Sequence, residues 1–230
     1  MTLKEAQSRV HMFDVNGLLE STRTDLVDFQ LPYAHPHAPT RDFAAAIESI
    51  KPTTIIGVST IGGAFSKEVV EAMSRVNERP IILALSNPTE HAECTAEQAY
   101  TWSNGKAIYA AGVPFSPVTF NGRTFIPGQA NNFYIFPAVA MAIYATQAKR
   151  VSDELFIEAA KAVADQVSPE LLKQGLLYPL QANILETEIK TAARVAKLVF
   201  DSGLAGVERP ADMEALIRSH VYTPAYPKLA

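Results

Sequence analysis

The first 111 residues alternate between short apolar runs and segments that carry one apolar stripe. Charge-free runs rich in apolar residues are typical of strands in a buried parallel sheet, and three are predicted as such strands: 53–58, 80–85 and 107–111. Apolar residues at helical spacing, or the capping-box spacing of Thr95 and Gln98, predict helices at 42–50, 66–76 and 95–102. A β-prone run at 9–13 is predicted as a further strand, followed by Asp14 and a turn.

Strands alternating with helices at this pitch predict an α/β fold: an open parallel sheet with helices on both faces. After residue 131 the pattern is helical throughout, with predicted helices at 132–148, 152–167, 169–174 and 182–202. No repeat or flexible linker separates these helices from the sheet. We therefore predict one domain at 1–203 and a C-terminal arm at 204–230.

Composition narrows the class of protein. The chain has 230 residues, 48% of them hydrophobic, which excludes a disordered, collagen-like or coiled-coil protein. A net charge of −4 favours small-molecule chemistry over nucleic-acid binding. The single cysteine, Cys94, excludes an intrachain disulfide, and no apolar run reaches the roughly 20 residues of a membrane helix. We expect a soluble protein of the cytoplasm, or of the mitochondrial matrix in a eukaryote, with no membrane partner.

In parallel α/β sheets, ligands bind outside the carboxyl ends of the strands. Asp14 follows the first predicted strand, where an acid can accept hydrogen bonds from an adenosine ribose; the alternative is an acid in an ordinary loop. The turn 57–63 is rich in small residues that would let a cofactor approach the backbone, or it is an ordinary strand-to-helix turn. Asn87, before Pro88, can donate to and accept from a ligand, or can form a simple Asx-Pro turn.

Three amide side chains crowd into the segment 127–132, before an apolar helix. Asn131 can cap that helix, which leaves the other amides able to face a carboxylate or carboxamide. His35 and His37 form an H-x-H pair, but without a third ligand we predict a solvated loop rather than a metal site. Cys94 has no partner group that would make it a nucleophile, so we predict a small packing residue.

Six segments, taken together and in order, resemble malic enzymes, and the resemblance extends from about Met12 to Phe200. These segments are MFDVNGLL (12–19), KPTTIIGV (51–58), NERPIILALSNPT (77–89), AECTAE (92–97), GVPF (112–115) and PGQANNFYIFP (127–137). The resemblance implies a Rossmann-type cofactor domain that lacks the first strand and its glycine-rich turn. The cofactor-binding residues that it implies are Asp14, Val58, Ser59, Gly62, Asn87 and Asn131. The substrate-binding residues that it implies are Asn87, Asn131 and, as a weaker candidate, Asn132.

The family reaction is the oxidative decarboxylation of malate to pyruvate and CO2, with transfer of hydride to the cofactor and help from Mn²⁺ or Mg²⁺. Its lysine base, tyrosine acid, metal ligands and glycine-rich turn belong to family segments that precede the part matched here. We therefore assign no catalytic residue and no metal ligand in this chain, and we expect the chain by itself to be inactive. The family also implies a homo-oligomer.

The resemblance bears on the choice of cofactor as well. Members that use NADP place a basic residue shortly after the ribose acid, whereas Val15 follows Asp14 here and Gln30 occupies the later position. A carboxylate without a nearby cation would repel a 2′-phosphate, so we expect NAD rather than NADP. Two alternatives remain open: part of a malolactic enzyme, and a dinucleotide-binding or oligomerisation module without catalysis.

Overall fold

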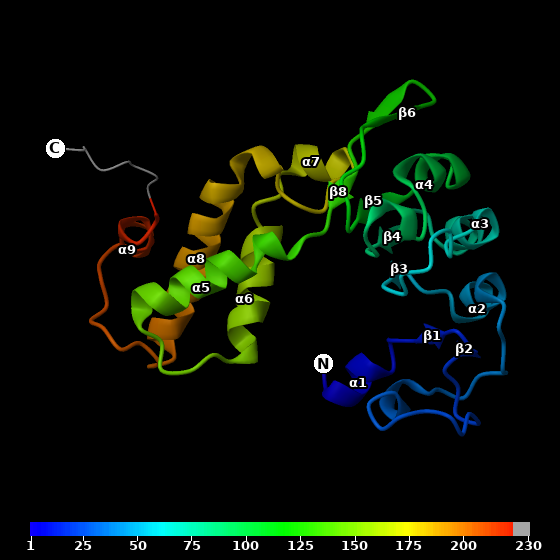
Figure 1. Ribbon diagram of the computed structural model, residues 1–230, viewed down its shortest axis with the longest axis horizontal. Helices are drawn as coiled ribbons and strands as arrows, with labels where there is room; N and C mark the ends of the chain where they lie inside the picture. Colours follow the sequence, from blue (N-terminus) through cyan, green and yellow to red (C-terminus); the bar gives the residue numbers. More distant parts are fainter. Residues whose placement is uncertain (223–230) are drawn as a thin grey trace. The chain divides into compact units, whose positions relative to one another are not determined.

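The computed structural model describes residues 1–222. Contacts within the chain divide it into two compact units, and the boundary in the sequence falls between Pro127 and Gly128 (Figure 1). Each unit has an apolar core of its own. The predicted boundary between a domain at 1–203 and an arm at 204–230 remains a prediction, and the last part of that arm, 223–230, lies outside the described residues.

The first unit contains three parallel strands that are neighbours in the order of the chain. They are β3 (Thr54–Gly57), β4 (Ile81–Ala84) and β5 (Ile108–Ala111). Helix α3 (Lys67–Val76) connects the first two strands, and α4 (Ala96–Trp102) connects the next two. Thr54 lies opposite Ile81, and Ile81 opposite Ile108. The predicted parallel α/β fold, with these strands and helices, is confirmed.

One face of these strands and the helices beside it form the core of the first unit. Helix α2 (Phe43–Ile50) packs against α3, and α3 packs against α4 (Figure 1). Ile55, Ile82 and Tyr109 point from the strands into this core. The neighbouring Ile56 is 58% exposed, so the prediction that this strand is buried on both faces is wrong at that residue.

Local capping explains where several helices begin. Thr95 and Gln98 form the predicted capping box, and the Asp42 carboxylate accepts a hydrogen bond from the Ala45 N–H at 3.0 Å. A second capping box, of Thr2 and Glu5, opens helix α1 (Leu3–Gln7), which the sequence analysis missed. A threonine followed three residues later by a glutamate or glutamine therefore marks the start of a helix at both sites.

The prediction of a strand at 9–13 is wrong both in the length of the strand and in the sheet to which it belongs. Only Phe13 of that run is extended: β1 (Phe13–Asp14) pairs antiparallel with β2 (Gly17–Leu18) in a two-stranded sheet of its own. The turn between the two strands is closed by Gly17, at φ +113°, and by the Asp14 carboxylate, which accepts the Asn16 N–H at 2.8 Å. The tight turn returns the chain at once, so the run cannot continue as a strand of the parallel sheet.

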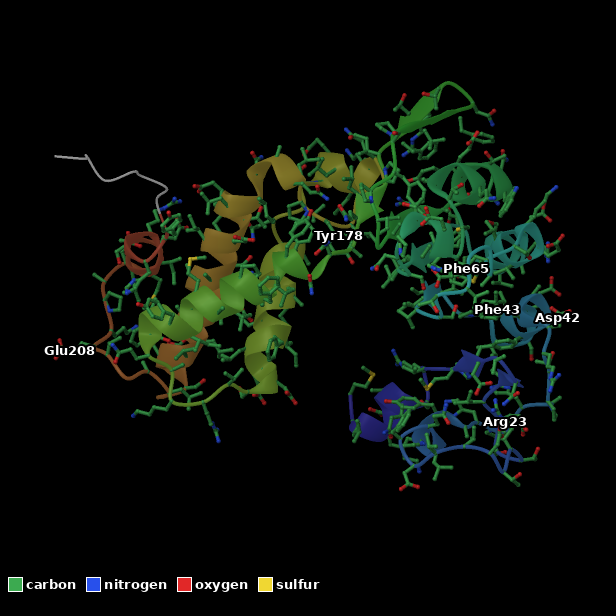
Figure 2. The ribbon with its side chains drawn as sticks, viewed as in Figure 1. Arg23, Asp42, Phe43, Phe65, Tyr178 and Glu208 are labelled. Carbon is green, nitrogen blue, oxygen red and sulfur yellow. The ribbon has the colours of Figure 1, made fainter. Side chains whose placement is uncertain are left out.

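Aromatic rings join this hairpin to the core of the first unit. The ring centroid of Phe13 lies 4.9 Å from that of Phe43. The Phe43 centroid in turn lies 6.0 Å from that of Phe65, and both of these residues are labelled in Figure 2. The remaining elements of the unit are two 3-10 helices and a second hairpin, which was not predicted: η1 (Leu31–Tyr33), η2 (Thr89–His91), β6 (Val118–Phe120) and β7 (Arg123–Phe125).

The second unit is helical, as predicted. Its elements are β8 (Gly128–Gln129), η3 (Asn132–Tyr134), α5 (Phe136–Thr146), α6 (Asp153–Ala164), α7 (Pro169–Lys173), η4 (Gln181–Asn183), α8 (Ile184–Asp201) and α9 (Met213–Ser219). Buried alanines, among them Ala142 of α5 and Ala196 of α8, contribute small side chains to the core that α5 and α8 share. Helix α9 was not predicted, and its Ile217 is fully buried in the same core. None of the helices formed by residues 1–222 is long and apolar enough to span a membrane.

Candidate functional site

The carboxyl ends of β3 and β4 bring together four of the predicted site residues. Val58, Ser59 and Gly62 lie in the loop after β3, and Asn87 lies in the loop after β4. The two loops start side by side, because the Leu85 N–H donates to the Gly57 carbonyl at 2.9 Å. The edge of the sheet that the sequence indicated is therefore built from adjacent polar loops.

This edge offers unpaired groups and open space to a ligand. The Asn87 side chain is exposed and has no hydrogen-bond partner within residues 1–222. Val58 is 73% exposed and Ile61 is 56% exposed, so apolar surface accompanies the amide. No atom lies within 4 Å of the point where a side chain on Gly63 would begin. Exposed apolar surface beside a free amide fits a ligand that carries both rings and polar groups, as a dinucleotide does.

Two glycines of this region are required by the packing of the protein. A Cβ on Gly57 would lie 2.3 Å from Cδ of Glu93, and a Cβ on Gly62 would lie 2.2 Å from the Glu90 carbonyl oxygen. Both distances are too short for any side chain. These glycines let the loop after β3 pack directly on the loop after β4, a reason that the sequence analysis did not consider.

The side chain against Gly57 is a buried carboxylate that the sequence analysis overlooked. Glu93 is 0% exposed, and its Oε1 accepts the Ser86 hydroxyl at 2.5 Å and the Ser59 N–H at 3.3 Å. Its Oε2 accepts the Ser86 N–H at 3.3 Å. The Ser86 oxygen in turn accepts the Thr60 N–H at 2.9 Å. One signal could have indicated burial: Glu93 stands between Ala92 and Cys94, two residue types that are often buried.

Cys94 is the packing residue that was predicted. Its side chain belongs to the core of the first unit, and burial, followed by the adjacent Glu93, raises the pKa of its thiol to about 12. The thiol is therefore neutral near pH 7, which does not suit a nucleophile. The Tyr109 hydroxyl donates to the Cys94 carbonyl at 2.7 Å and so fixes this segment to β5.

Asp14 lies in a charged cluster with Arg23 and Asp25. Both of its oxygens accept from the Arg23 guanidinium, at 2.9 Å each, and Asp25 accepts from the same group at 2.9 and 2.7 Å. The hydrogen bonds from Arg23 lower the pKa of Asp14 and lower that of Asp25 to about 2. The premise that no cation stands near Asp14 is therefore wrong, because the fold brings together residues nine positions apart.

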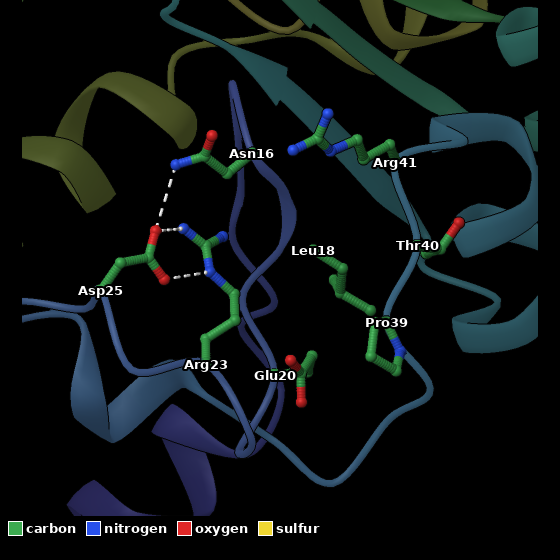
Figure 3. Close-up of a pocket in the computed structure, with 8 residues that line it drawn as sticks. All are labelled: Asn16, Leu18, Glu20, Arg23, Asp25, Pro39, Thr40 and Arg41. Carbon is green, nitrogen blue, oxygen red and sulfur yellow. Dashed lines mark hydrogen bonds and ion pairs between the residues drawn. The ribbon is translucent and has the colours of Figure 1, made fainter.

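An open groove of about 490 Å³ adjoins this cluster. The residues that line it come from the hairpin, the segment that follows it and the segment before α2, and they are Asn16, Leu18, Glu20, Arg23, Asp25, Pro39, Thr40 and Arg41 (Figure 3). Arg41 is exposed and forms no ion pair with any residue that the structure describes. The groove therefore presents one arginine bound to carboxylates and one that is available to an anion.

Asn131 and Asn132 belong to the second unit. The Asn131 side-chain oxygen accepts the Phe133 N–H at 3.1 Å, which confirms the predicted cap, although the helix that it opens is the short η3. Its amide nitrogen is not used by that bond. Asn132 is exposed at the first position of η3. In the same unit, the Gln181 side chain bonds that of Gln129.

The H-x-H pair is not a solvated loop, since His35 and His37 are half-buried. The ring centroid of His11 lies 4.7 Å from that of His35 and 5.1 Å from that of His37. Burial and these two neighbours lower the pKa of His11. Across residues 1–222, no group of three histidine, cysteine or acidic side chains is arranged to hold a metal ion.

Comparison with known proteins gives the family. A family model described as the malic enzyme NAD-binding domain matches residues 1–200. The chain is 46% identical to NADP-dependent malic enzyme 1 of Arabidopsis thaliana over 227 residues, which cover 98% of this chain and 39% of that protein. It is also 46% identical to an NADP-dependent malic enzyme of Vitis vinifera, over 97% of this chain and 38% of that protein.

Solved structures agree on the fold. The malic enzyme of Entamoeba histolytica superimposes with a TM-score of 0.69 at 22% identity, over 91% of this chain and 40% of that one. A malic enzyme of Pyrococcus horikoshii gives a TM-score of 0.61 at 21% identity, over 84% of this chain and 41% of that one.

A parallel α/β unit with polar loops at its strand ends belongs to the class of folds that bind ligands at that edge. Within that class, this chain belongs to the malic enzyme family, and residues 1–200 match the dinucleotide-binding domain of that family. The chain spans about two fifths of the length of the curated relatives that it matches.

Proposed function

We propose that the full-length protein containing this chain oxidises malate with a nicotinamide dinucleotide and releases pyruvate and CO2. The observation that carries the proposal is the unpaired, exposed Asn87 amide at the carboxyl edge of a parallel sheet in a malic enzyme domain. The dinucleotide, when bound, supplies the acceptor for the hydride that leaves C2 of malate. The part of the chain described here supplies binding and orientation.

The binding roles follow from the hydrogen-bonding groups that these side chains leave unpaired. We propose that the Asn87 amide contacts the nicotinamide end and the substrate, beside Val58, Ser59 and Gly62. Asn131 keeps an amide nitrogen that can donate to a carboxylate, and the exposed Asn132 is the second candidate.

Asp14 is the proposed contact for the adenosine ribose. Its side chain is 30% exposed. A carboxylate offers about four acceptor positions in all, and the bonds from Arg23 and Asn16 do not use every one. A ribose hydroxyl can therefore still donate to Asp14.

The residues described here do not fit the metal that the family implies, because they contain no group of three suitable ligands. We propose that this chain contributes no catalytic residue. We propose instead that the lysine, the tyrosine and the Mn²⁺ or Mg²⁺ ligands lie in the part of the relatives' length that this chain does not match. The chain by itself should therefore bind without turnover.

The cations near Asp14 bear on the choice between NAD and NADP. NAD was expected because no cation was evident near Asp14, but Arg23 bonds that carboxylate and Arg41 lines the adjoining groove. A 2′-phosphate carries close to two negative charges, and an unpaired guanidinium can bind it through two hydrogen bonds. Together with the NADP-dependent relatives, this favours NADP, and NAD is the alternative.

The test is an assay of the full-length protein with malate and Mn²⁺, supplied with NADP or NAD, in parallel with calorimetric titration of the 230-residue chain. We expect turnover by the full-length protein, with a lower KM for NADP, and binding without turnover by the chain. Release of lactate without net reduction of the cofactor would show a malolactic enzyme. Binding without turnover by the full-length protein would show a binding module. We also propose that the full-length protein is a homo-oligomer, which its mass in solution would test.

A further inference from the structure

We propose that Glu93 is a positioning residue for the dinucleotide: it holds the loops after β3 and β4 in one arrangement, so that Ser59 and Asn87 are presented to the ligand together. This inference rests on the proposed function, because it assigns a role within that same site. Glu93 is 0% exposed, so it acts through its neighbours and is not a catalytic residue.

Burial makes this carboxylate costly unless its oxygens are satisfied. The donors that meet Glu93 are neutral: the Ser86 hydroxyl, the Ser86 N–H and the Ser59 N–H. A carboxylate is an acceptor at both oxygens, whereas the amide of glutamine would turn a donor toward one of these groups. The three donors therefore select an acid at position 93.

The same carboxylate sets the direction of a second bond. Because the Ser86 hydroxyl gives its proton to Glu93, its oxygen is free to accept the Thr60 N–H, at 2.9 Å. Thr60 has a φ of +60°, which a residue with a side chain rarely adopts. The conformation of the loop after β3 at Thr60 thus depends on Ser86, and Ser86 depends on Glu93.

The backbone around Glu93 holds the other end of that loop. The Phe65 N–H donates to the Glu93 carbonyl at 2.9 Å, and the Gly63 N–H donates to the Ala92 carbonyl at 3.1 Å. The loop after β3 is therefore bonded near its start through the Glu93 side chain and near its end through the main chain of the same segment. Asn87 follows Ser86 directly, so its place relative to Ser59 is set by one buried group.

The chain offers a matched control for this network. Ser86 and Ser103 are both buried, and the hydroxyl of each donates one hydrogen bond and accepts another. Ser103 donates to the Tyr100 carbonyl and accepts the Ala107 N–H at 3.0 Å, next to the amino end of β5. Ser103→Ala therefore removes an equivalent pair of bonds at the end of the sheet remote from the site.

The experiment compares Glu93→Gln, Ser86→Ala and Ser103→Ala with wild type in the full-length protein, by thermal unfolding and by KM for the dinucleotide. We expect Glu93→Gln to raise that KM about tenfold, the effect of losing one buried hydrogen bond where the glutamine NH2 faces another donor. Ser86→Ala should raise it about threefold, since the hydroxyl bonds to Glu93 and Thr60 are lost, whereas the two N–H bonds to Glu93 remain and no donor faces another donor. Ser103→Ala should lower Tm and leave KM within about twofold.

The possible outcomes separate the two proposals. If wild type oxidises malate but Glu93→Gln and Ser86→Ala change KM no more than Ser103→Ala does, Glu93 is only structural and the inference fails while the proposed function stands. If Glu93→Gln does not fold, the same comparison of Ser86→Ala with Ser103→Ala decides the question. If wild type neither binds a dinucleotide nor oxidises malate, the proposed function fails, and the role of Glu93 fails with it.

Discussion

Two acidic regions of the first unit differ in burial and in the donors that bind their carboxylates. At the strand ends, Glu93 is fully buried and is met by a hydroxyl and backbone N–H groups. In and after the N-terminal hairpin, Asp14 and Asp25 lie near the surface and share one guanidinium, that of Arg23. Buried neutral donors give a geometry that salt does not screen, whereas a surface ion pair contributes less free energy and is weakened by salt. The buried region should therefore control rigidity, and the charged region should control which anion is accepted.

The strongest way to break the buried region is Gly57→Ala. The new methyl group would lie 2.3 Å from Cδ of Glu93, which cannot move aside without losing its hydrogen bonds. We expect the free energy of unfolding to fall by about 1–3 kcal/mol, as for an overpacked core, measured by urea unfolding. In a Glu93→Ala background the same substitution should cost clearly less, since its obstacle is gone. Equal costs in the two backgrounds would show that Gly57 and Glu93 are not coupled.

Two tyrosines of the same core give a matched pair of smaller effect. Tyr109→Phe leaves the buried Cys94 carbonyl without the hydroxyl that donates to it, and should cost about 1–2 kcal/mol. The Tyr100 hydroxyl is buried and has no hydrogen-bond partner in the described part of the chain, so Tyr100→Phe should be neutral or stabilising. In urea unfolding, Tyr109→Phe should therefore be less stable than wild type, and Tyr100→Phe should be at least as stable as wild type. A larger loss for Tyr100→Phe would contradict the assignment of these hydrogen bonds.

The charged region is tested by pH and by Arg23→Gln. Hydrogen bonds from Arg23 lower the folded-state pKa of Asp25 from 3.8 to about 2, and they also lower that of Asp14. A depressed folded-state pKa adds stability above the unfolded value and loses it as pH falls through the folded value. Wild type should thus be more stable than Arg23→Gln at pH 6, and the difference should shrink between about pH 4 and pH 2. A difference that is constant over this range, or unchanged by 0.5 M salt, would assign the effect of Arg23 to packing.

The smallest effect is a change in rate that requires no loss of stability. Since the Cys94 thiol is buried and its pKa is raised to about 12, it should react with a thiol-specific reagent at pH 8 only when the surrounding segment opens. Glu93→Gln should increase this labelling rate, whereas Arg23→Gln should leave it unchanged. Equal acceleration by both substitutions would show that the two regions open together, and the contrast between them would be lost.

Much of the fold was predictable because the signals are local. The apolar runs at 53–58, 80–85 and 107–111 became β3, β4 and β5, with no end shifted by more than one residue. The helix predicted at 42–50 and the capping box at Thr95 also appear in the structure, because each signal depends on residues close to one another in the chain. The hairpin of Phe13 with Leu18 was missed, since a β-prone run does not show which strand will pair with it.

The edge of the sheet that holds the candidate site was determined by the sequence, because parallel strands connected by helices place their loops at a common edge. Asn87 and Ser59 were therefore found from the order of residues. The tertiary structure decided which groups support them. Glu93 bonds Ser59 across 34 residues, and Arg23 reaches Asp14 across nine. Such contacts arise only when the chain has folded, because burial and pairing depend on neighbours in space that no local pattern of residues encodes.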